Sequence, residues 1–227
     1  MKYFTKGELT LWLSSLALII ISFFMFSNDG YLTLMASLIG ATALIFCAKG
    51  NPFGQILMII FCVLYGIISL SARYYGELMT YVLMSLPMAV ISLITWFKNP
   101  FEGSKNQVKV NKIKPQEYLF LFFLAALVTL IFYFILKYFN TANLIPSTIS
   151  VTTSFIAAYL TARRSPYYAL AYGANDIVLI VLWGLASIYD VSYISVLTCF
   201  VVFLANDLYG FAAWLKMEKL QQKRSDL

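Results

Sequence analysis

Long runs of apolar residues separated by short polar segments dominate this sequence. Eight of these runs approach the ~20 residues that a helix needs to cross a bilayer: 9–26, 31–48, 53–71, 77–97, 118–137, 144–162, 167–188 and 191–214. Barrel strands need only about 10 residues, and the runs show no alternation of period two. The pattern predicts an all-α polytopic membrane protein with eight transmembrane helices.

The spacing of the runs indicates an internal repeat. One long polar connection follows the fourth run, and one further run precedes a second tight cluster of three, giving the order 1+3+1+3. Because three spans reverse the direction of the chain, a single linker helix lets the second triplet enter from the same side as the first. The triplets are then parallel repeats related by an axis along the membrane normal. The predicted organisation is an extra N-terminal transmembrane helix in 1–30, a first three-helix repeat in 31–97, a basic cytoplasmic loop in 98–117, a linker helix in 118–143, a second three-helix repeat in 144–215 and a cytoplasmic tail in 216–227.

Short matching segments favour this duplication. Pro52 and Pro166 each open the middle span of a triplet after a basic, polar stretch, and Trp96 and Trp214 each close the last span. Proline is also common at any helix start, but order, polarity and spacing agree between the two blocks. We expect both tryptophans to act as interfacial anchors at the membrane boundary.

The composition agrees with a membrane protein and assigns its orientation. Of 227 residues, 61% are hydrophobic and 11% are charged, and the mean hydropathy is +0.81. With a cytoplasmic N-terminus, all 16 lysine and arginine residues except Arg73 and Lys137 fall on the cytoplasmic side, as does the C-terminus. Topology therefore explains the net charge of +6 without a nucleic-acid partner. The basic loop is expected to lie against anionic lipid of the bilayer.

The sequence contains no motif typical of an enzyme or of a metal site. The chain has no histidine, no Gly-rich phosphate loop and no nucleophile paired with a base. Cys47, Cys62 and Cys199 lie in predicted spans, where cysteine behaves as a small apolar residue. We predict no catalytic residue, no metal site and no cofactor. Residues 9–26 are interpreted as the first transmembrane helix and not as a signal peptide, because no small-residue cleavage motif follows.

Polar residues inside the spans are candidate site residues, because burying them in lipid is costly. Asn175-Asp176 and Asn206-Asp207 lie near the middle of the last two spans, at the depth where transporters bind substrate. The predicted substrate-binding residues are Asn206, Tyr209, Asn175, Asp176, Trp183, Tyr172, Asp207 and Tyr65. Amide and carboxylate groups beside aromatic planes suit a flat, polar or cationic ring. Asparagine and aspartate that merely bond across the helix bundle are the alternative.

The segments Tyr75-Gly76-Glu77, Asn206-Asp207-Leu208-Tyr209-Gly210 and Gly50-Asn51-Pro52 resemble the PnuC family of vitamin transporters, over about residues 31–216. The resemblance implies a 3+1+3 core related to the SWEET architecture and uptake of nicotinamide riboside by facilitated diffusion. It further implies trapping of the product by a cytoplasmic kinase, a small homo-oligomer and a bacterial inner membrane. By position, Asn206 and Tyr209 are the closest matches to the binding residues of the family, and Asn175 and Trp183 match less specifically.

Two departures bear on the substrate. Ala89 stands where family members commonly carry glutamine, and a paired tryptophan motif near Trp183 is not reproduced. Nicotinamide riboside is the first expectation, with thiamine and then riboflavin as alternatives. Proton coupling through Asp176 or Asp207 stays open beside facilitated diffusion. The remaining alternatives are an exporter or sugar carrier of the wider SWEET-like architecture and a membrane protein that acts as a scaffold or lipid-interacting subunit without transport.

Overall fold

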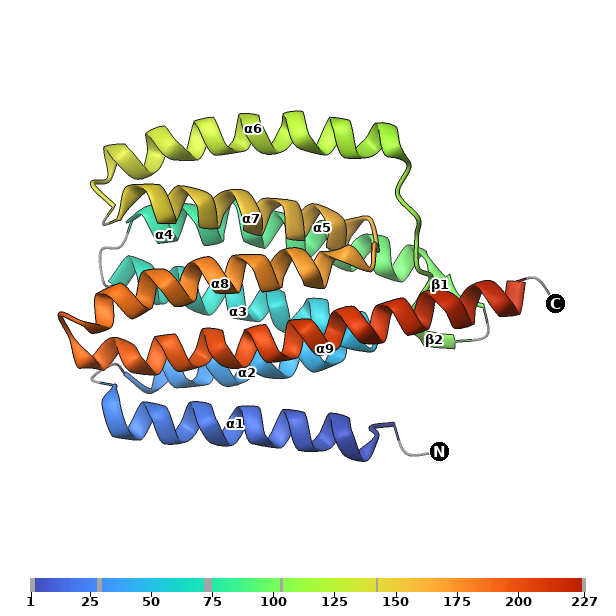
Figure 1. Ribbon diagram of the computed structural model, residues 1–227, viewed down its shortest axis with the longest axis horizontal. Coiled ribbons are helices and arrows are strands. Elements are labelled where there is room, and N and C mark those ends of the chain that lie inside the picture. Colours follow the sequence, from blue (N-terminus) through green and yellow to red (C-terminus); the bar gives the residue numbers. More distant parts are fainter. Residues whose placement is uncertain (1–2, 28–29, 72–74, 103, 142, 226–227) are drawn as a thin grey trace.

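The protein is a bundle of long, nearly parallel helices in a computed structural model that describes all residues except 1–2, 28–29, 72–74, 103, 142 and 226–227 (Figure 1). The helices are α1 (Lys6–Phe26), α2 (Tyr31–Ala48), α3 (Phe53–Ser71), α4 (Tyr75–Met79), the π-helix η1 (Thr80–Ser85), α5 (Leu86–Lys98), α6 (Pro115–Tyr138), α7 (Leu144–Ala162), α8 (Tyr167–Ser187), the short 3₁₀-helix η2 (Val191–Tyr193) and α9 (Ile194–Ser225). Eight helical segments of the described chain are long and apolar enough to cross a membrane, with α4, η1 and α5 forming one of them. The predicted fold class is confirmed.

The two triplets face each other as two layers. In Figure 1, α7, α8 and α9 lie in front of α5, α3 and α2, and α9 contacts α2 at one edge while α5 contacts α7 at the other. The six helices thus form a closed ring. Helices α6 and α1 lie outside it, at opposite edges, where α6 packs on α7, and α1 packs on α2 and α9. Both chain termini lie at the same end of the bundle (Figure 1).

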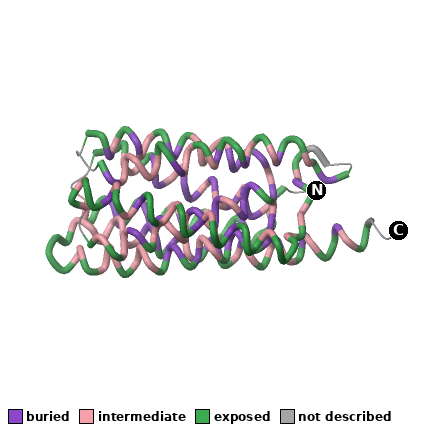
Figure 2. The backbone as a smooth tube through the Cα atoms, turned by 90° about the horizontal axis from the view of Figure 1, so that it is seen from above, coloured by how far each residue is buried: buried purple, intermediate pink, exposed green. Residues whose placement is uncertain are grey.

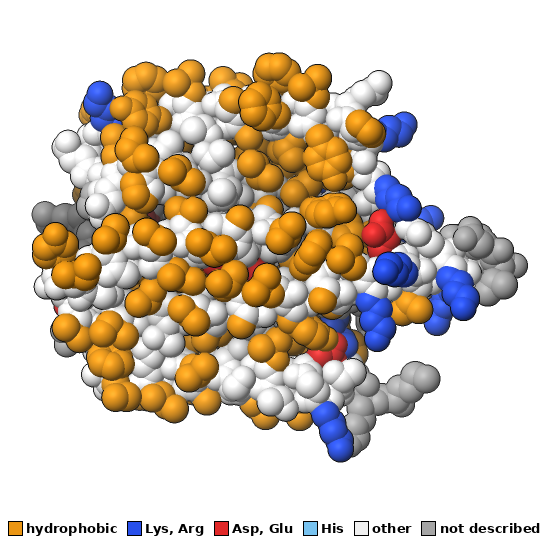
Figure 3. Space-filling view, in the orientation of Figure 1, with side chains coloured by type: hydrophobic (Ala, Val, Ile, Leu, Met, Phe, Trp, Pro, Cys, Tyr) orange, Lys and Arg blue, Asp and Glu red, His pale blue; other side chains and the backbone are white. Residues whose placement is uncertain are grey.

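The distribution of side chains fits a bundle surrounded by lipid. Buried positions concentrate inside the ring, and the outer helices carry many exposed ones (Figure 2). Large apolar side chains cover the lateral surface, whereas lysine and arginine gather at the end that holds the termini (Figure 3). Lys137 lies at the far end of α6, as expected, and Arg73 is outside the described residues. A lipid environment stabilises such an apolar surface, which water would not.

The last helix and the basic loop differ from the predicted boundaries. Helix α9 continues to Ser225, so most of the predicted tail is helical. Within the predicted loop, β1 (Pro100–Phe101) pairs antiparallel with β2 (Ser104–Val108). The Gln221 side chain accepts from the Val110 N–H at 2.8 Å and donates to the Val108 carbonyl at 2.9 Å. These contacts hold the loop against the helical extension, a long-range pairing that hydropathy cannot predict.

The prediction that Trp96 and Trp214 are interfacial anchors is wrong. Both side chains are 0% exposed. The Trp96 N–H donates to the Thr161 carbonyl at 2.9 Å, and the Trp214 N–H donates to the Cys47 carbonyl at 2.8 Å. Each carbonyl also accepts a backbone N–H of the turn that follows its helix, from Arg164 or from Gly50, so the indole supplies a second hydrogen bond that joins two helices. The two residues therefore lie in the interior, although their positions in the sequence are typical of a membrane boundary.

Two ion pairs join the outer helices to the ring. Lys49 Nζ lies 2.9 Å from Glu8 Oε1, and Glu8 also accepts from the Tyr209 hydroxyl at 2.9 Å. Arg163 pairs with Glu117, whose carboxylate raises the pKa of the guanidinium. Each glutamate lies in the first turn of its helix, where a negative charge is favourable. The ion pairs fix α1 to α2 and α6 to α7 at the end that holds the termini.

Candidate functional site

A cavity of about 700 Å³ lies between the two layers of the ring, in the size range of small-molecule sites. Its wall extends to Asn140, Thr141 and Tyr189 at the end opposite the termini, where Tyr189 is 91% exposed. Toward the termini, the wall reaches Ser92 and Thr161, next to the buried tryptophan pair. The cavity is therefore open toward one end of the bundle and closed toward the other.

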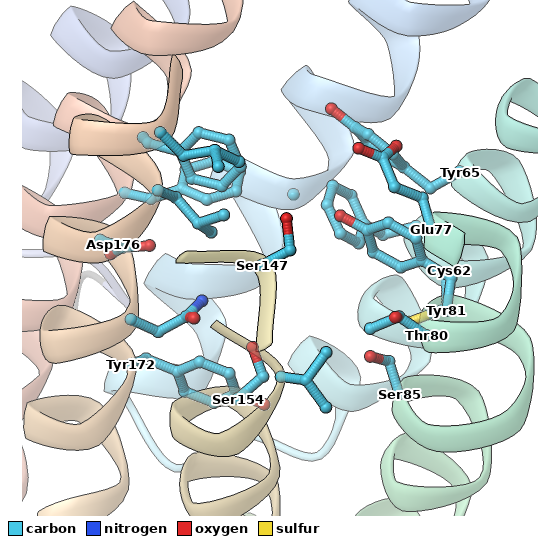
Figure 4. Close-up of a pocket in the computed structure, with 18 of the residues that line it drawn as sticks. Cys62, Tyr65, Glu77, Thr80, Tyr81, Ser85, Ser147, Ser154, Tyr172 and Asp176 are labelled. Atoms are coloured by element: carbon cyan, nitrogen blue, oxygen red, sulfur yellow. The ribbon is translucent and has the colours of Figure 1, made fainter. Parts of the chain in front are cut away.

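The second repeat supplies most of the predicted site residues. The cavity wall includes Tyr65, Tyr172, Asn175, Asp176, Trp183 and Asp207. Tyr172, Asp176 and Trp183 lie on one stripe of α8, as their spacing of i, i+4 and i+11 predicts. Figure 4 shows Tyr172 and Asp176 on one wall and Tyr65, Glu77 and Tyr81 on the opposite wall.

Asp176 and Asp207 form a carboxyl pair. They are 3% and 4% exposed, and each carboxyl group lies close enough to interact electrostatically with the other. Oδ2 of Asp176 receives no hydrogen bond from an N–H or hydroxyl of the described chain. The pair therefore presents a carboxyl oxygen without a hydrogen-bond partner to the cavity.

Asn175 lies at the wall, but its amide oxygen is already engaged. It accepts from the Ser150 hydroxyl at 3.0 Å and from the Thr153 hydroxyl at 2.8 Å, both on α7. These bonds join α7 to α8 and fix the orientation of the amide. Asn175 therefore combines the two alternatives considered from the sequence, since it bonds across the bundle and also borders the cavity.

The structure does not bring Asn206 and Tyr209 to the cavity, which corrects their predicted placement. The Asn206 amide donates to the Ser15 hydroxyl at 2.9 Å, and the Tyr209 hydroxyl donates to Glu8. Ser15 and Glu8 both belong to α1. The two predicted residues do share a helical face, but that face packs on the N-terminal helix. Asp207, the next residue along, turns toward the cavity instead.

Sequence reasoning missed several polar residues of the wall. Glu77, Gln55 and Thr80 line the cavity, as does Tyr81, which the sequence left outside the predicted site. Glu77 is the first residue of the predicted span 77–97, whereas α4 begins two residues earlier, at Tyr75. The signal in the sequence that points to Glu77 is a carboxylate at the edge of an apolar run, because such a residue is costly in a membrane span.

The electrostatic character of the cavity is acidic. Its described lining contains the carboxyl groups of Glu77, Asp176 and Asp207 and no lysine or arginine. Aromatic faces add to this character, because the rings of Tyr65 and Tyr81 lie 5.0 Å apart and those of Trp183 and Tyr193 lie 5.3 Å apart. Carboxylates and aromatic faces both attract cations. The described residues show no cluster of metal-ligating side chains.

Comparisons with known proteins agree with this architecture. The sequence model of the nicotinamide mononucleotide transporter family matches residues 30–216. The nicotinamide riboside transporter PnuC of Neisseria mucosa is 24% identical over 200 residues, which are 86% of this chain and 76% of that protein. The crystal structure of the vitamin B3 transporter PnuC superposes with a TM-score of 0.81 at 22% identity, covering 96% of this chain and 94% of the other. These relatives are transporters and not enzymes. The chain, with eight apolar helical segments and an acidic, aromatic cavity between its two layers, belongs to the nicotinamide mononucleotide transporter family.

Proposed function

We propose that this protein takes up nicotinamide riboside by facilitated diffusion. The observation that carries the proposal is the acidic, aromatic lining of the cavity between the two repeats. Nicotinamide riboside is a flat aromatic cation, and such ligands are bound by aromatic faces and balanced by carboxylates. The family match and the resemblance to a nicotinamide riboside transporter support the same ligand.

The substrate contacts that we propose come from both repeats. Tyr65 supplies an aromatic face from α3, and Tyr172 and Trp183 supply faces from α8. The carboxyl pair of Asp176 and Asp207 balances the positive charge. A cavity of this size, lined by aromatic and polar side chains, is typical of a small-molecule site, which favours a transporter over the scaffold alternative.

The lining of the cavity also supports metabolic trapping, in which phosphorylation in the cytoplasm prevents the substrate from leaving the cell. A cytoplasmic kinase that phosphorylates the riboside converts a cation into a molecule with a negatively charged phosphate. Phosphate binding calls for lysine, arginine or free N–H groups, whereas the described lining offers three carboxyl groups and no basic side chain. We infer that the phosphorylated product does not return through the cavity, so that phosphorylation gives the passive step its direction.

The proposed location is the inner membrane of a bacterium, with both termini in the cytoplasm. The gathering of lysine and arginine at the end with the termini supports this orientation (Figure 3). The cavity then opens toward the outside, as uptake requires. A small homo-oligomer is part of the proposal by resemblance to the family.

Thiamine is the second candidate, because its thiazolium ring is also an aromatic cation. Riboflavin is uncharged and gains nothing from the carboxyl groups of the wall, so it ranks third. Ligand-induced thermal stabilisation of the purified protein separates the candidates, because a ligand that binds the folded state raises apparent stability. We expect a shift with nicotinamide riboside and none with nicotinamide mononucleotide, which carries the phosphate. A shift with thiamine alone would reassign the substrate.

Uptake into proteoliposomes then tests the mechanism. Facilitated diffusion predicts that labelled nicotinamide riboside equilibrates without accumulating, and that a proton gradient leaves the final level unchanged. Enclosing a riboside kinase with ATP should convert equilibration into accumulation. Accumulation driven by the proton gradient alone would instead establish proton coupling.

A further inference from the structure

Glu77 is a carboxylate of the cavity wall that the proposed substrate contacts leave unused. It lies in the first turn of α4 and lines the cavity. In Figure 4 its side chain lies beside Tyr65 and near Tyr81, on the wall opposite Asp176. Among the described residues, the ion pairs are Glu8 with Lys49 and Glu117 with Arg163, so none of these cations balances Glu77.

Close packing fixes the position of Glu77. The preceding residue, Gly76, is buried, and a Cβ there would lie 2.9 Å from Leu136 Cδ2 of α6 and closer still to the hydroxyl oxygen of Thr141. A larger residue at position 76 would therefore have to displace these two side chains. After α4, the backbone becomes a π-helix in which the Leu86 N–H bonds to the Tyr81 carbonyl, one residue before Pro87. π-helical turns are frequent at functional sites, and this one places Tyr81 on the same wall as Glu77.

The surroundings of Glu77 match a ring-bearing cation. The rings of Tyr65 and Tyr81 lie 5.0 Å apart beside it and offer aromatic faces. Trp183 of the second repeat lines the same cavity, and its buried indole N–H has no acceptor in the described chain. A ligand carbonyl or hydroxyl would satisfy this donor. A carboxylate held in such a wall is costly unless a positive charge balances it.

The two walls together enclose a position for one positive charge. Glu77 comes from the first repeat, whereas the carboxyl pair of Asp176 and Asp207 comes from the second. The ligand space lies between them (Figure 4). We propose that Glu77 is a specificity-determining residue, whose carboxylate selects an aromatic cation over a neutral ligand of the same shape. This inference rests on the proposed function and names the group in the first repeat that recognises the charge.

The test compares a cation with its neutral counterpart. Nicotinamide riboside carries a pyridinium charge, and its 1,4-dihydro form has nearly the same shape without that charge. Binding of both forms is measured by calorimetry on the purified wild-type protein and on Glu77→Gln, Glu77→Asp and the control Asp190→Asn. Asp190 is exposed at the same end of the molecule and caps η2 through the Ser192 N–H, a role that asparagine also fills. The control therefore removes an equal charge outside the cavity.

We expect Glu77→Gln to weaken binding of the cation by about 10-fold to 100-fold, the range of a charge-assisted contact. The dissociation constant of the neutral form should change by less than about threefold. Glu77→Asp should retain the preference for the cation, and Asp190→Asn should bind both forms as wild type does. Equal losses for both forms, or no loss for either in a folded Glu77→Gln protein, would overturn the proposal. Failure of the wild-type protein to bind nicotinamide riboside is a separate result, which refutes the proposed substrate.

Discussion

The indole rings of Trp96 and Trp214 lie 5.4 Å apart, and each donates its N–H to the first helix of the opposite repeat. The acceptors are the carbonyls of Thr161 in α7 and Cys47 in α2, each two residues before the C-cap of its helix. The pair therefore joins the two layers of the ring beneath the closed end of the cavity. A change of the cavity from one open end to the other has to separate or rearrange these contacts.

Replacement of either tryptophan by phenylalanine should destabilise the protein. The substitution removes one hydrogen bond between helices and leaves a space where the pyrrole ring was, while the Thr161 or Cys47 carbonyl keeps its backbone donor, so we expect a loss of about 1–3 kcal/mol in the free energy of unfolding. Thermal unfolding in detergent measures the effect. Trp12→Phe is the matched control, because the Trp12 N–H bonds the Thr42 hydroxyl at 3.2 Å in a partly exposed position and should matter less. Equal melting temperatures for all three variants would contradict the assigned role.

The ion pair of Glu8 should matter more than that of Glu117. The side chains of Lys49 and Glu8 are 19% and 7% exposed, whereas that of Arg163 is 44% exposed. Glu8→Gln leaves Lys49 poorly hydrated and without its counter-ion, and we expect the free energy of unfolding to fall by ~3 kcal/mol. Glu117→Gln should cost about 1 kcal/mol or less and be sensitive to salt. Thermal unfolding at two ionic strengths distinguishes the two variants. A larger loss of stability in Glu117→Gln than in Glu8→Gln would contradict the prediction that the more buried ion pair contributes more.

Asn206→Ala tests whether the residue binds substrate or supports α1. Its amide bonds Ser15, away from the cavity, so the variant should lose about 1 kcal/mol of stability and keep its affinity for nicotinamide riboside. Asp176→Ala, which changes the cavity wall, should lose that affinity. Both are measured by ligand-induced thermal shift. A folded Asn206→Ala protein that no longer responds to the ligand would restore the placement expected from the sequence.

Equivalent turns in the two repeats predict a stabilising substitution. Gly50 and Arg164 follow α2 and α7 with φ of +65° and +59°, a conformation that costs a residue with a Cβ about 1–2 kcal/mol. Arg164→Gly should therefore raise the melting temperature, and it also removes a buried guanidinium nitrogen that has no partner in the described chain. Gly50→Ala should lower the melting temperature. A destabilised Arg164→Gly protein would mean that the arginine side chain makes a contribution larger than the strain.

The sequence predicted the features that depend on hydropathy and on position along one helix. The eight spans and the common stripe of Tyr172, Asp176 and Trp183 are of this kind. Features that depend on which helices become neighbours could not be predicted. A tryptophan at the end of a span has the same local pattern whether it faces lipid or a second repeat, and Asn206 faces α1 only because α1 packs on α9.

The two ion pairs described above also bear on the ancestry of the protein. Glu8 and Glu117 are each the third residue of their helix, and each pairs with the residue that directly follows the next helix, Lys49 or Arg163. The correspondence therefore begins at α1 and α6, before the three-helix repeats. If the repeats arose by gene duplication, this correspondence favours a duplicated segment of four helices, in which α1 is equivalent to the linker helix α6. Two copies of such a four-helix ancestor, assembled as a symmetric dimer, would already have contained both ion pairs and both tryptophan contacts.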